Sequence, residues 1–274
     1  TASRCASSPK PPDMTIKEVV AALERFAPLP LQEGYDNAGL QIGLTEGEEV
    51  SGVLLCLDVT EAVIDEAVAH GCNLVVAHHP LLFRGVKRID DATQVTRCVR
   101  RAIRAGVGIY AAHTNLDNAR GGVNHRLARA LGLTPIAPLA PIDDAGNGGG
   151  LLAECPEAMA PMDMLAHIRR VLGCTSLHYA EGPQRPIRRV ALCGGAGESL
   201  MEAALQSGAD LFLTGEMGYH RYFGHEQHMW IAVAGHYETE QFTPALMADL
   251  LRDACQGLPL HVARTCTNPI RTLA

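Results

Sequence analysis

Apolar runs alternate with amphipathic stretches along the first half of the chain. A capping box of Thr15 and Glu18 opens the first amphipathic stretch, which predicts a helix. Apolar runs predict strands at 40–43, 53–58, 74–77 and 108–112. Helical spacing predicts helices at 60–70, near 93–105 and near 122–131. This alternation predicts an α/β fold, with largely parallel sheets flanked by helices on both faces.

The second half of the chain repeats the first at an offset of 137 residues. Without a gap, 53–79 aligns with 190–216, and seven of the 27 aligned positions are identical. At an offset of 123, His113 and Asp117 align with His236 and Glu240, each pair just after an apolar run. The aligned segments match both in their apolar strands and in the polar residues that follow those strands. We therefore predict two similar α/β units related by internal duplication.

The domain boundaries follow from composition. The stretch 134–150 is rich in Pro and Gly without an apolar period, and we expect a linker there. This places a first α/β unit at 14–133 and a second at 151–274, the latter containing a helix at 161–172 and a strand at 175–180. The segment 1–13 lacks the apolar core of a signal peptide, and we expect a trimmed start and a disordered N-terminal segment.

Composition narrows the class of protein. The chain has 274 residues, 47% of them hydrophobic, which suffices for a sizeable core. Its net charge of −7 argues against broad binding of nucleic acid or of an anionic membrane. No apolar run approaches the roughly 18–20 residues of a membrane span. The nine cysteines are scattered and form no C-x-x-C pair, so we expect a reducing, cytoplasmic location rather than a disulfide framework.

The candidate chemistry lies at the predicted strand ends, where ligands gather in parallel α/β sheets. The chain has 12 histidines, an unusually high number for its length. Histidine and carboxylate side chains follow the apolar strands: His78, His79, His113, Asp117, Glu216, His236 and Glu240. Imidazole with carboxylate and no thiolate favours first-row ions such as Zn²⁺, Fe²⁺, Mn²⁺, Co²⁺ or Ni²⁺. An adjacent histidine pair can diverge to serve two ions, and a carboxylate can bridge them.

The motifs also match a known family. They are YDNAGLQIG (35–43), VAHHPLLFRG (76–85), AAHTNLDNARGGVN (111–124), LTGEMGYH (213–220), GHYETE (235–240) and TNPI (267–270). Over nearly the whole chain, these motifs resemble the NGG-interacting-factor-three-like (YbgI-like) family, also labelled GTP cyclohydrolase 1 type 2 homologues. Tyr35 replaces a Trp common in that family, and the chain has the length of its short forms.

The resemblance implies two similar α/β domains and a centre of two divalent first-row metal ions. The implied ligands are His78, His79, Asp117, His236 and Glu240, with Glu240 bridging the two ions. It also implies a homo-oligomer, typically a toroidal hexamer with the metal sites facing an inner cavity. His113, Glu216 and His220 match family positions around the site.

The implied activity is that of a metal-dependent hydrolase acting on a nucleotide or another phosphorylated small molecule, by analogy with GTP cyclohydrolase. Glu216 or His113 would then transfer the proton, or would instead orient the true ligands. His220 is better explained as a wall or hydrogen-bonding residue than as a ligand. The alternative function is a non-catalytic metal-binding regulatory or interaction protein, and a third is metal delivery. An open coordination shell beside a cavity would favour catalysis.

Three other features have two interpretations each. Arg97, Arg100, Arg101 and Arg104 share one helical face, which fits a solvated or interface surface better than a phosphate site. The turn Gly194-Gly195-x-Gly197 lacks the spacing of a dinucleotide fingerprint and is weak evidence for nucleotide binding. Asp36 either forms a turn with Asn37 or lines the site.

Overall fold

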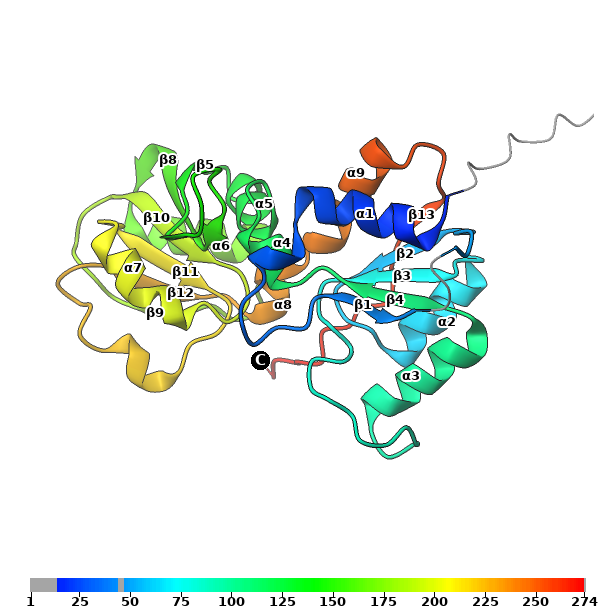
Figure 1. Ribbon diagram of the computed structural model, residues 1–274. Helices are drawn as coiled ribbons and strands as arrows, with labels where there is room; N and C mark the ends of the chain where they lie inside the picture. The colour runs from blue at the N-terminus through cyan, green and yellow to red at the C-terminus, as the bar shows by residue number, and fades with distance from the viewer. Residues whose placement is uncertain (1–13, 44–46, 274) are drawn as a thin grey trace, which may run out of the picture.

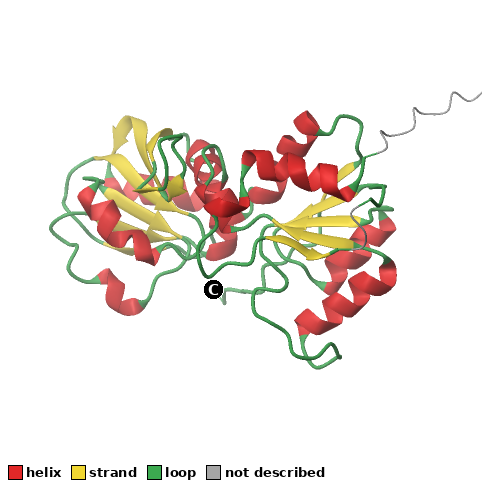
Figure 2. Cartoon of the chain, in the orientation of Figure 1, coloured by secondary structure: helices red, strands yellow, loops and turns green. Residues whose placement is uncertain are grey.

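The computed structural model describes residues 14–43 and 47–273 of the chain. The disorder expected of 1–13 falls outside these residues. The chain forms two lobes, each a β-sheet flanked by helices (Figures 1 and 2). The predicted α/β class is confirmed.

The first sheet contains five strands in the order β1-β4-β3-β2-β13. These strands are β1 (Gly39–Ile42), β2 (Val53–Cys56), β3 (Leu74–Ala77), β4 (Gly108–Ala111) and β13 (Leu260–Val262). All neighbours are parallel except β1, which runs antiparallel to β4. Every residue of the three central strands is buried, because helices cover both faces of the sheet.

Two pairs of helices cover the first sheet. On one face lie α1 (Ile16–Phe26), followed by the 3₁₀ turn η1 (Leu29–Leu31), and α9 (Thr243–Ala254); they form a core with Val53, Leu55 and Val76. On the other face lie α2 (Glu61–Ala69) and α3 (Gln94–Ala105), which pack on Leu54, Val75 and Ile109 (Figure 1). Alternate residues of each strand thus enter separate cores.

The second sheet contains six strands in the order β5-β8-β10-β11-β12-β9. They are β5 (Thr134–Ala137), β8 (Leu151–Met159), β9 (His178–Ala180), β10 (Ile187–Cys193), β11 (Leu211–Thr214) and β12 (Trp230–Val233). Only β10, β11 and β12 pair in parallel, and the strands added on either side are antiparallel. The second sheet is therefore mixed around a parallel centre.

The remaining elements surround this sheet or connect the lobes. Helices α5 (Val123–Ala130) and α6 (Pro161–Leu172) pack on one face, and α7 (Met201–Gln206) packs on the other. Short elements make the connections: α4 (Thr114–Asn118), β6 (Ala140–Pro141), β7 (Gly148–Gly149), η2 (Glu198–Leu200), η3 (Tyr219–Tyr222) and α8 (His236–Glu240).

The internal repeat is visible in the strand register. Val53 pairs with Leu74 between β2 and β3, and Val190 pairs with Leu211 between β10 and β11. Both pairs are related by the offset of 137 residues that aligned the two sequences. Each unit then adds a third parallel strand, β4 or β12, that leads into a short helix, α4 or α8. The duplicated units therefore present their strand ends in the same way.

The elements cross the expected domain boundaries. The segment 134–150, expected to be a linker, instead contains β5 at the edge of the second sheet and the hairpin β6–β7. An edge strand with one exposed side needs no apolar period, so the sequence pattern did not reveal it. In addition, α9 and β13, expected in the second unit, pack on the first sheet. In exchange, Leu127 and Leu131 at α5 enter the core of the second unit.

Two surface properties complete the description. Within the described residues, no helix combines the length and apolar character needed to cross a membrane. Eight cysteines in the described part of the chain carry free thiols, and only Cys266 among them is exposed.

Candidate metal centre

The metal-ligand candidates of both units meet where the parallel strands end. His78 and His79 continue β3, since their backbone N–H groups still donate to Cys56 and Leu57 at 3.1 and 2.9 Å. His113 is the N-cap of α4, which carries Asp117 after β4. His236 and Glu240 lie on α8, directly after β12. The five residues predicted as ligands therefore come together from opposite halves of the chain.

The carboxylate of Glu240 lies at the centre of the cluster. It is buried, and its Oε2 atom lies 2.9 Å from Nε2 of His79 and 3.0 Å from Nε2 of His236. Its other oxygen, Oε1, lies 3.8 Å from Nε2 of His78. The two oxygens thus face different histidines, an arrangement suited to a carboxylate that contacts two cations.

His78 supplies the test of whether a cation fits. Its side chain is fully buried, and its Nε2 atom has no hydrogen-bond partner among the described residues. The nearest carboxylate oxygen, Oδ1 of Asp117, lies 3.5 Å away. A buried polar atom without a partner is costly, and a metal ion bound between Nε2 and the two carboxylates would satisfy it. The residues present therefore fit a divalent ion.

Each imidazole of the cluster is held by its other nitrogen. The Nδ1 atom of His78 lies 2.7 Å from the carbonyl oxygen of Ala112. Carboxylates hold the others: Asp58 at 2.7 Å from His79, Glu216 at 2.9 Å from His236, and Asp36 at 2.7 Å from His113. Such contacts fix the tautomer and orient histidine ligands of metals. For His78, His79 and His236 they direct Nε2 toward the Glu240 carboxylate.

The cluster contains three overlapping groups of side chains that could hold a metal ion. They are His78, His79 and His113; His79, His236 and Glu240; and His78, Asp117 and Glu240. The last two groups share only Glu240. These groups comprise the five predicted ligands together with His113.

Close packing strongly shifts the protonation equilibria of the cluster. Burial lowers the pKa of His79, but its hydrogen bonds to Asp58 and Glu240 outweigh this and raise the pKa to about 10. The pKa of His236 is likewise raised to about 9, because its hydrogen bond to Glu240 overcomes burial. Burial raises the pKa of Glu240, but hydrogen bonds from His236 and His79 and the nearby charge of His78 hold it well below its usual range. For Asp117, burial dominates and the pKa is raised. Without a metal ion, protons on the histidines therefore neutralise the charge of Glu240.

The glycine at position 195 lets the turn after β10 pass close to the side chains of the cluster. Gly195 has φ of +61°, and a Cβ atom there would lie 2.3 Å from Oε1 of Glu240. The Gly195 carbonyl accepts hydrogen bonds from the backbone N–H groups of Gly215 and Glu216, both at 2.9 Å. The glycine-rich turn that offered weak evidence for nucleotide binding thus makes room for Glu240 and His236.

A cavity of about 800 Å³ opens beside the cluster. Its lining includes His79, His113, Asp117, His236 and Glu240. The apolar part of the lining comes from the first unit and from the β6–β7 hairpin and η2: Tyr35, Pro80, Phe83, Ala140, Pro141, Ile142 and Leu200. A site that opens on such a cavity has room for a small molecule beside the ligands.

The remaining candidate residues have varied positions. Glu216 contacts His236, but neither it nor His220 is among the residues that line the cavity. Asp36 does more than form a turn, because it holds both His113 and the N–H of Thr114, the latter at 3.1 Å. Sequence reasoning did not identify Asp58 as a supporting residue, although its place directly after the strand 53–56 was a usable signal.

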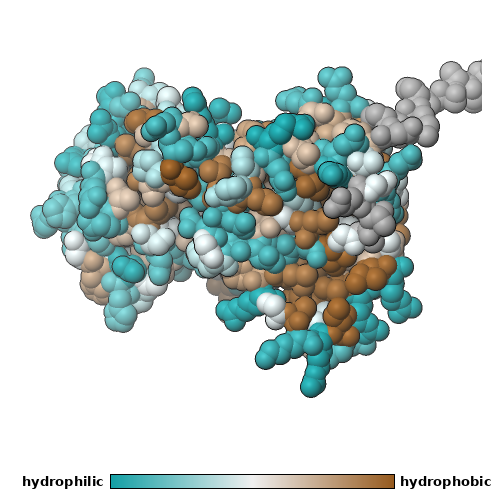
Figure 3. All heavy atoms as spheres, in the orientation of Figure 1, coloured by the Kyte–Doolittle hydropathy of each residue, from teal (hydrophilic) through white to brown (hydrophobic). Residues whose placement is uncertain are grey.

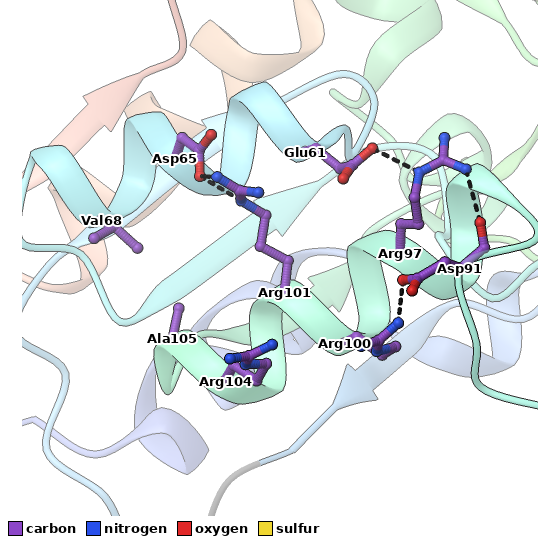
Figure 4. Close-up of a pocket in the computed structure, with 9 residues that line it drawn as sticks. All are labelled: Glu61, Asp65, Val68, Asp91, Arg97, Arg100, Arg101, Arg104 and Ala105. Carbon is purple, nitrogen blue, oxygen red and sulfur yellow. Dashed lines mark hydrogen bonds and ion pairs between the residues drawn. The ribbon is translucent and has the colours of Figure 1, made fainter.

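The four arginines lie on α3, away from the cluster, beside a groove of about 400 Å³ next to α2 (Figure 4). Three of them pair with carboxylates: Arg97 with Glu61, Arg100 with Asp91, and Arg101 with Asp65. These pairs agree with the interpretation of a solvated or interface surface, because the carboxylates neutralise most of the positive charge that would bind a phosphate.

Comparisons with known proteins identify the family and the fold of this chain. The family model described as Duf34/NIF3 (NGG1p interacting factor 3) matches residues 14–269. A GTP cyclohydrolase 1 type 2 homolog of Clostridium perfringens is 34% identical over 230 residues, covering 83% of this chain and 87% of that protein. NIF3-like protein 1 of Drosophila melanogaster is 30% identical over 267 residues, covering 93% and 88%.

Among solved structures, a hypothetical protein of Staphylococcus aureus superposes with a TM-score of 0.87 at 27% identity, covering 96% of this chain and 100% of that one. The protein ybgI, described as of unknown function, superposes with a TM-score of 0.81 at 23% identity, covering 94% and 100%. The latter similarity concerns the fold alone.

Proposed function

This chain belongs to the Duf34/NIF3 family, and from that premise we propose that it binds two divalent first-row metal ions and is a metal-dependent hydrolase acting on a nucleotide or another phosphorylated small molecule. The observation that carries the proposal is the partnerless Nε2 of the buried His78, facing two carboxylates beside an open cavity. The names of the bacterial relatives, as homologs of a GTP cyclohydrolase, support the substrate class.

In the proposed centre, His78, Asp117 and Glu240 would hold one ion, and His79, His236 and Glu240 would hold the other. Glu240 would serve both ions, since its two oxygens face different histidines. Bound ions of this kind supply Lewis acidity and a water activated near neutral pH.

Two residues are candidates for proton transfer, and their positions differ. His113 lines the cavity and is held at Nδ1 by Asp36, so its ring faces the space that a substrate would occupy. Glu216 instead holds Nδ1 of His236. We therefore assign proton transfer to His113 and orientation of His236 to Glu216.

The proposal extends to the setting of the protein. Buried free thiols suit a reducing compartment, and we propose a cytoplasmic location. Outside the cavity lining, large apolar side chains are exposed at β1 and the loop that follows β3: Leu40, Val86 and Ile89. Figure 3 shows apolar surface gathered in this region. Since such patches mark contact surfaces, they support assembly into a homo-oligomer, which we propose to be a hexamer.

The test combines metal content with turnover, for the wild type and for Glu240→Ala. We expect about two first-row ions per chain in the wild type and their loss in the variant, together with loss of turnover of GTP or of a panel of nucleotides and phosphoesters. Two tightly bound ions without turnover of any of these would favour the regulatory or interaction function instead. No stoichiometric metal after reconstitution under reducing conditions would overturn the dinuclear centre itself.

A further inference from the structure

The cavity beside the metal centre differs from a typical anion-binding site in the charge of its lining. Among the described residues that line it, there is neither a lysine nor an arginine, whereas Glu33, Asp117 and Glu240 contribute carboxylates. An anionic group would therefore meet these carboxylates, and only the histidines of the centre itself could offset their charge. When ions are bound, they are the strongest positive charge that the cavity offers to an anionic part of a substrate.

Large aromatic side chains are exposed at the same cavity. Tyr35 is 69% exposed and Phe83 is 43% exposed, although both line the cavity. Their ring centroids lie 6.4 Å apart with an interplanar angle of 73°. Phe83 also contacts the ring of His113 edge-on, with centroids 6.0 Å apart. The aromatic surface thus reaches from the cavity to the edge of the metal centre.

From this combination we infer that Tyr35 and Phe83 bind an uncharged planar ring of the substrate, such as a nucleobase, while the substrate's anionic group binds at the metal ions. The inference rests on the proposed function, for which it specifies how the substrate is recognised. Aromatic side chains hold bases through their π-faces without needing charge, and other apolar lining residues, among them Pro141, Ile142 and Leu200, suit the same ring. The cavity volume of about 800 Å³ is ample for a nucleoside-sized molecule.

The chain offers a matched control for the aromatic pair. Tyr219 and Phe223 form a second exposed pair, with centroids 5.4 Å apart and the same interplanar angle of 73°. Neither residue is among those that line the cavity. The double variant Tyr219→Ala/Phe223→Ala therefore removes one tyrosine and one phenylalanine side chain, as Tyr35→Ala/Phe83→Ala does, but outside the cavity.

The first experiment measures binding of the uncharged nucleosides adenosine and guanosine by calorimetry, with D-ribose as the probe that lacks a base. We expect wild-type protein to bind a nucleoside but not ribose, whether loaded with metal or treated with chelator. The dissociation constant should rise about tenfold or more in Tyr35→Ala/Phe83→Ala and stay within about twofold in the control variant. Equal nucleoside binding in all three proteins, or none in the wild type, would overturn the inference.

The second experiment compares guanosine with guanosine 5′-monophosphate. The phosphate should tighten binding at least about tenfold more in metal-loaded than in chelator-treated protein, because the described lining holds neither lysine nor arginine. An equal gain from the phosphate in chelator-treated protein would overturn this part. If the Tyr35/Phe83 variant changes the assembly mass in sedimentation and leaves nucleoside binding intact, the pair covers another copy of the chain and the inference is also overturned.

These outcomes separate the inference from the proposed hydrolase. Ring binding that depends on Tyr35 and Phe83, without any turnover, would remove the hydrolase and leave the binding site. Turnover with an unchanged KM in the Tyr35/Phe83 variant would instead support the hydrolase and overturn the ring-binding role of the two residues.

Discussion

The carboxylate of Asp58 connects His79 to the C-terminal segment of the chain. One of its oxygens lies 2.7 Å from Nδ1 of His79, and the other accepts a hydrogen bond from the hydroxyl of Thr267 at 2.5 Å. These contacts and His79's position beside Glu240 make Asp58 a positioning residue, because it fixes the imidazole that faces the centre. The candidate metal site is therefore supported by the segment around Thr267 as well as by the strand ends.

We predict that Asp58→Asn weakens metal binding without unfolding the protein. An amide cannot accept a charge-assisted hydrogen bond from His79 as a carboxylate does, and loss of such support typically costs about 10–100-fold in metal affinity. Competition with a chromophoric chelator would measure this. The control is Asp91→Asn, which removes an exposed carboxylate that pairs with Arg100 on α3. Equal affinities in the two variants would contradict the role given to Asp58.

We predict that Gly195→Ala displaces Glu240 and causes loss of bound metal. The added Cβ would lie 2.3 Å from Oε1 of Glu240 and 3.1 Å from Nε2 of His236. Gly208→Ala is the control, because Gly208 has φ of +70° but nothing within 4 Å of its Cβ position. The control should lose about 1–2 kcal/mol of stability from backbone strain alone and keep its metal. Metal content and thermal unfolding of the two variants test this, and full metal occupancy in Gly195→Ala would refute it.

We predict that Asp36 stabilises the fold in a pH-dependent manner. Burial raises its pKa, but hydrogen bonds from His113 and Thr114 outweigh this and lower the pKa to about 2. Because the folded-state pKa is depressed, the stabilisation is fully present above the unfolded-state pKa of about 4 and is lost as pH falls toward 2. Asp36→Asn should therefore cost roughly 2 kcal/mol at pH 7, and this difference should shrink below pH 4. Urea unfolding across this range measures it, and a pH-independent difference would speak against the prediction.

We predict that metal binding releases about two protons per chain at pH 7.5. Without metal, the raised pKa values of about 10 for His79 and about 9 for His236 keep both imidazoles protonated. A metal ion needs each Nε2 lone pair and must displace its proton. Calorimetry of zinc binding in buffers of different ionisation enthalpy counts the released protons. A value close to zero would show that these histidines do not ligate the metal.

Much of the candidate site follows from the sequence, because strand ends can be located from apolar runs. His78 and His79 follow a run of four apolar residues, and His113 and His236 end similar runs. The duplicated spacing then relates Asp117 to Glu240. This reasoning needs only local patterns and the rule that parallel strands end at one edge.

Local sequence patterns could not predict that α5 packs in the second unit while α9 and β13 pack in the first. The apolar face of α5 fits either sheet as well as the other, and only the assembled fold decides that Leu127 and Leu131 enter the second core. Likewise, nothing local distinguishes β13 from a strand of the second unit. Supporting contacts such as Asp58 with His79 depend on side-chain directions at atomic distance, which apolar periodicity does not encode.

The return of the chain to its first unit also affects its biosynthesis. Thr267 bonds Asp58 across 209 residues, and α9 and β13 complete the first sheet only after the second unit has been made. While the chain is still emerging from the ribosome, one face of β2 lacks its α9 cover and exposes apolar surface. The first unit should thus be prone to aggregate or to engage chaperones until α9 and β13 have been made. Loading of metal would accordingly follow the synthesis of both units.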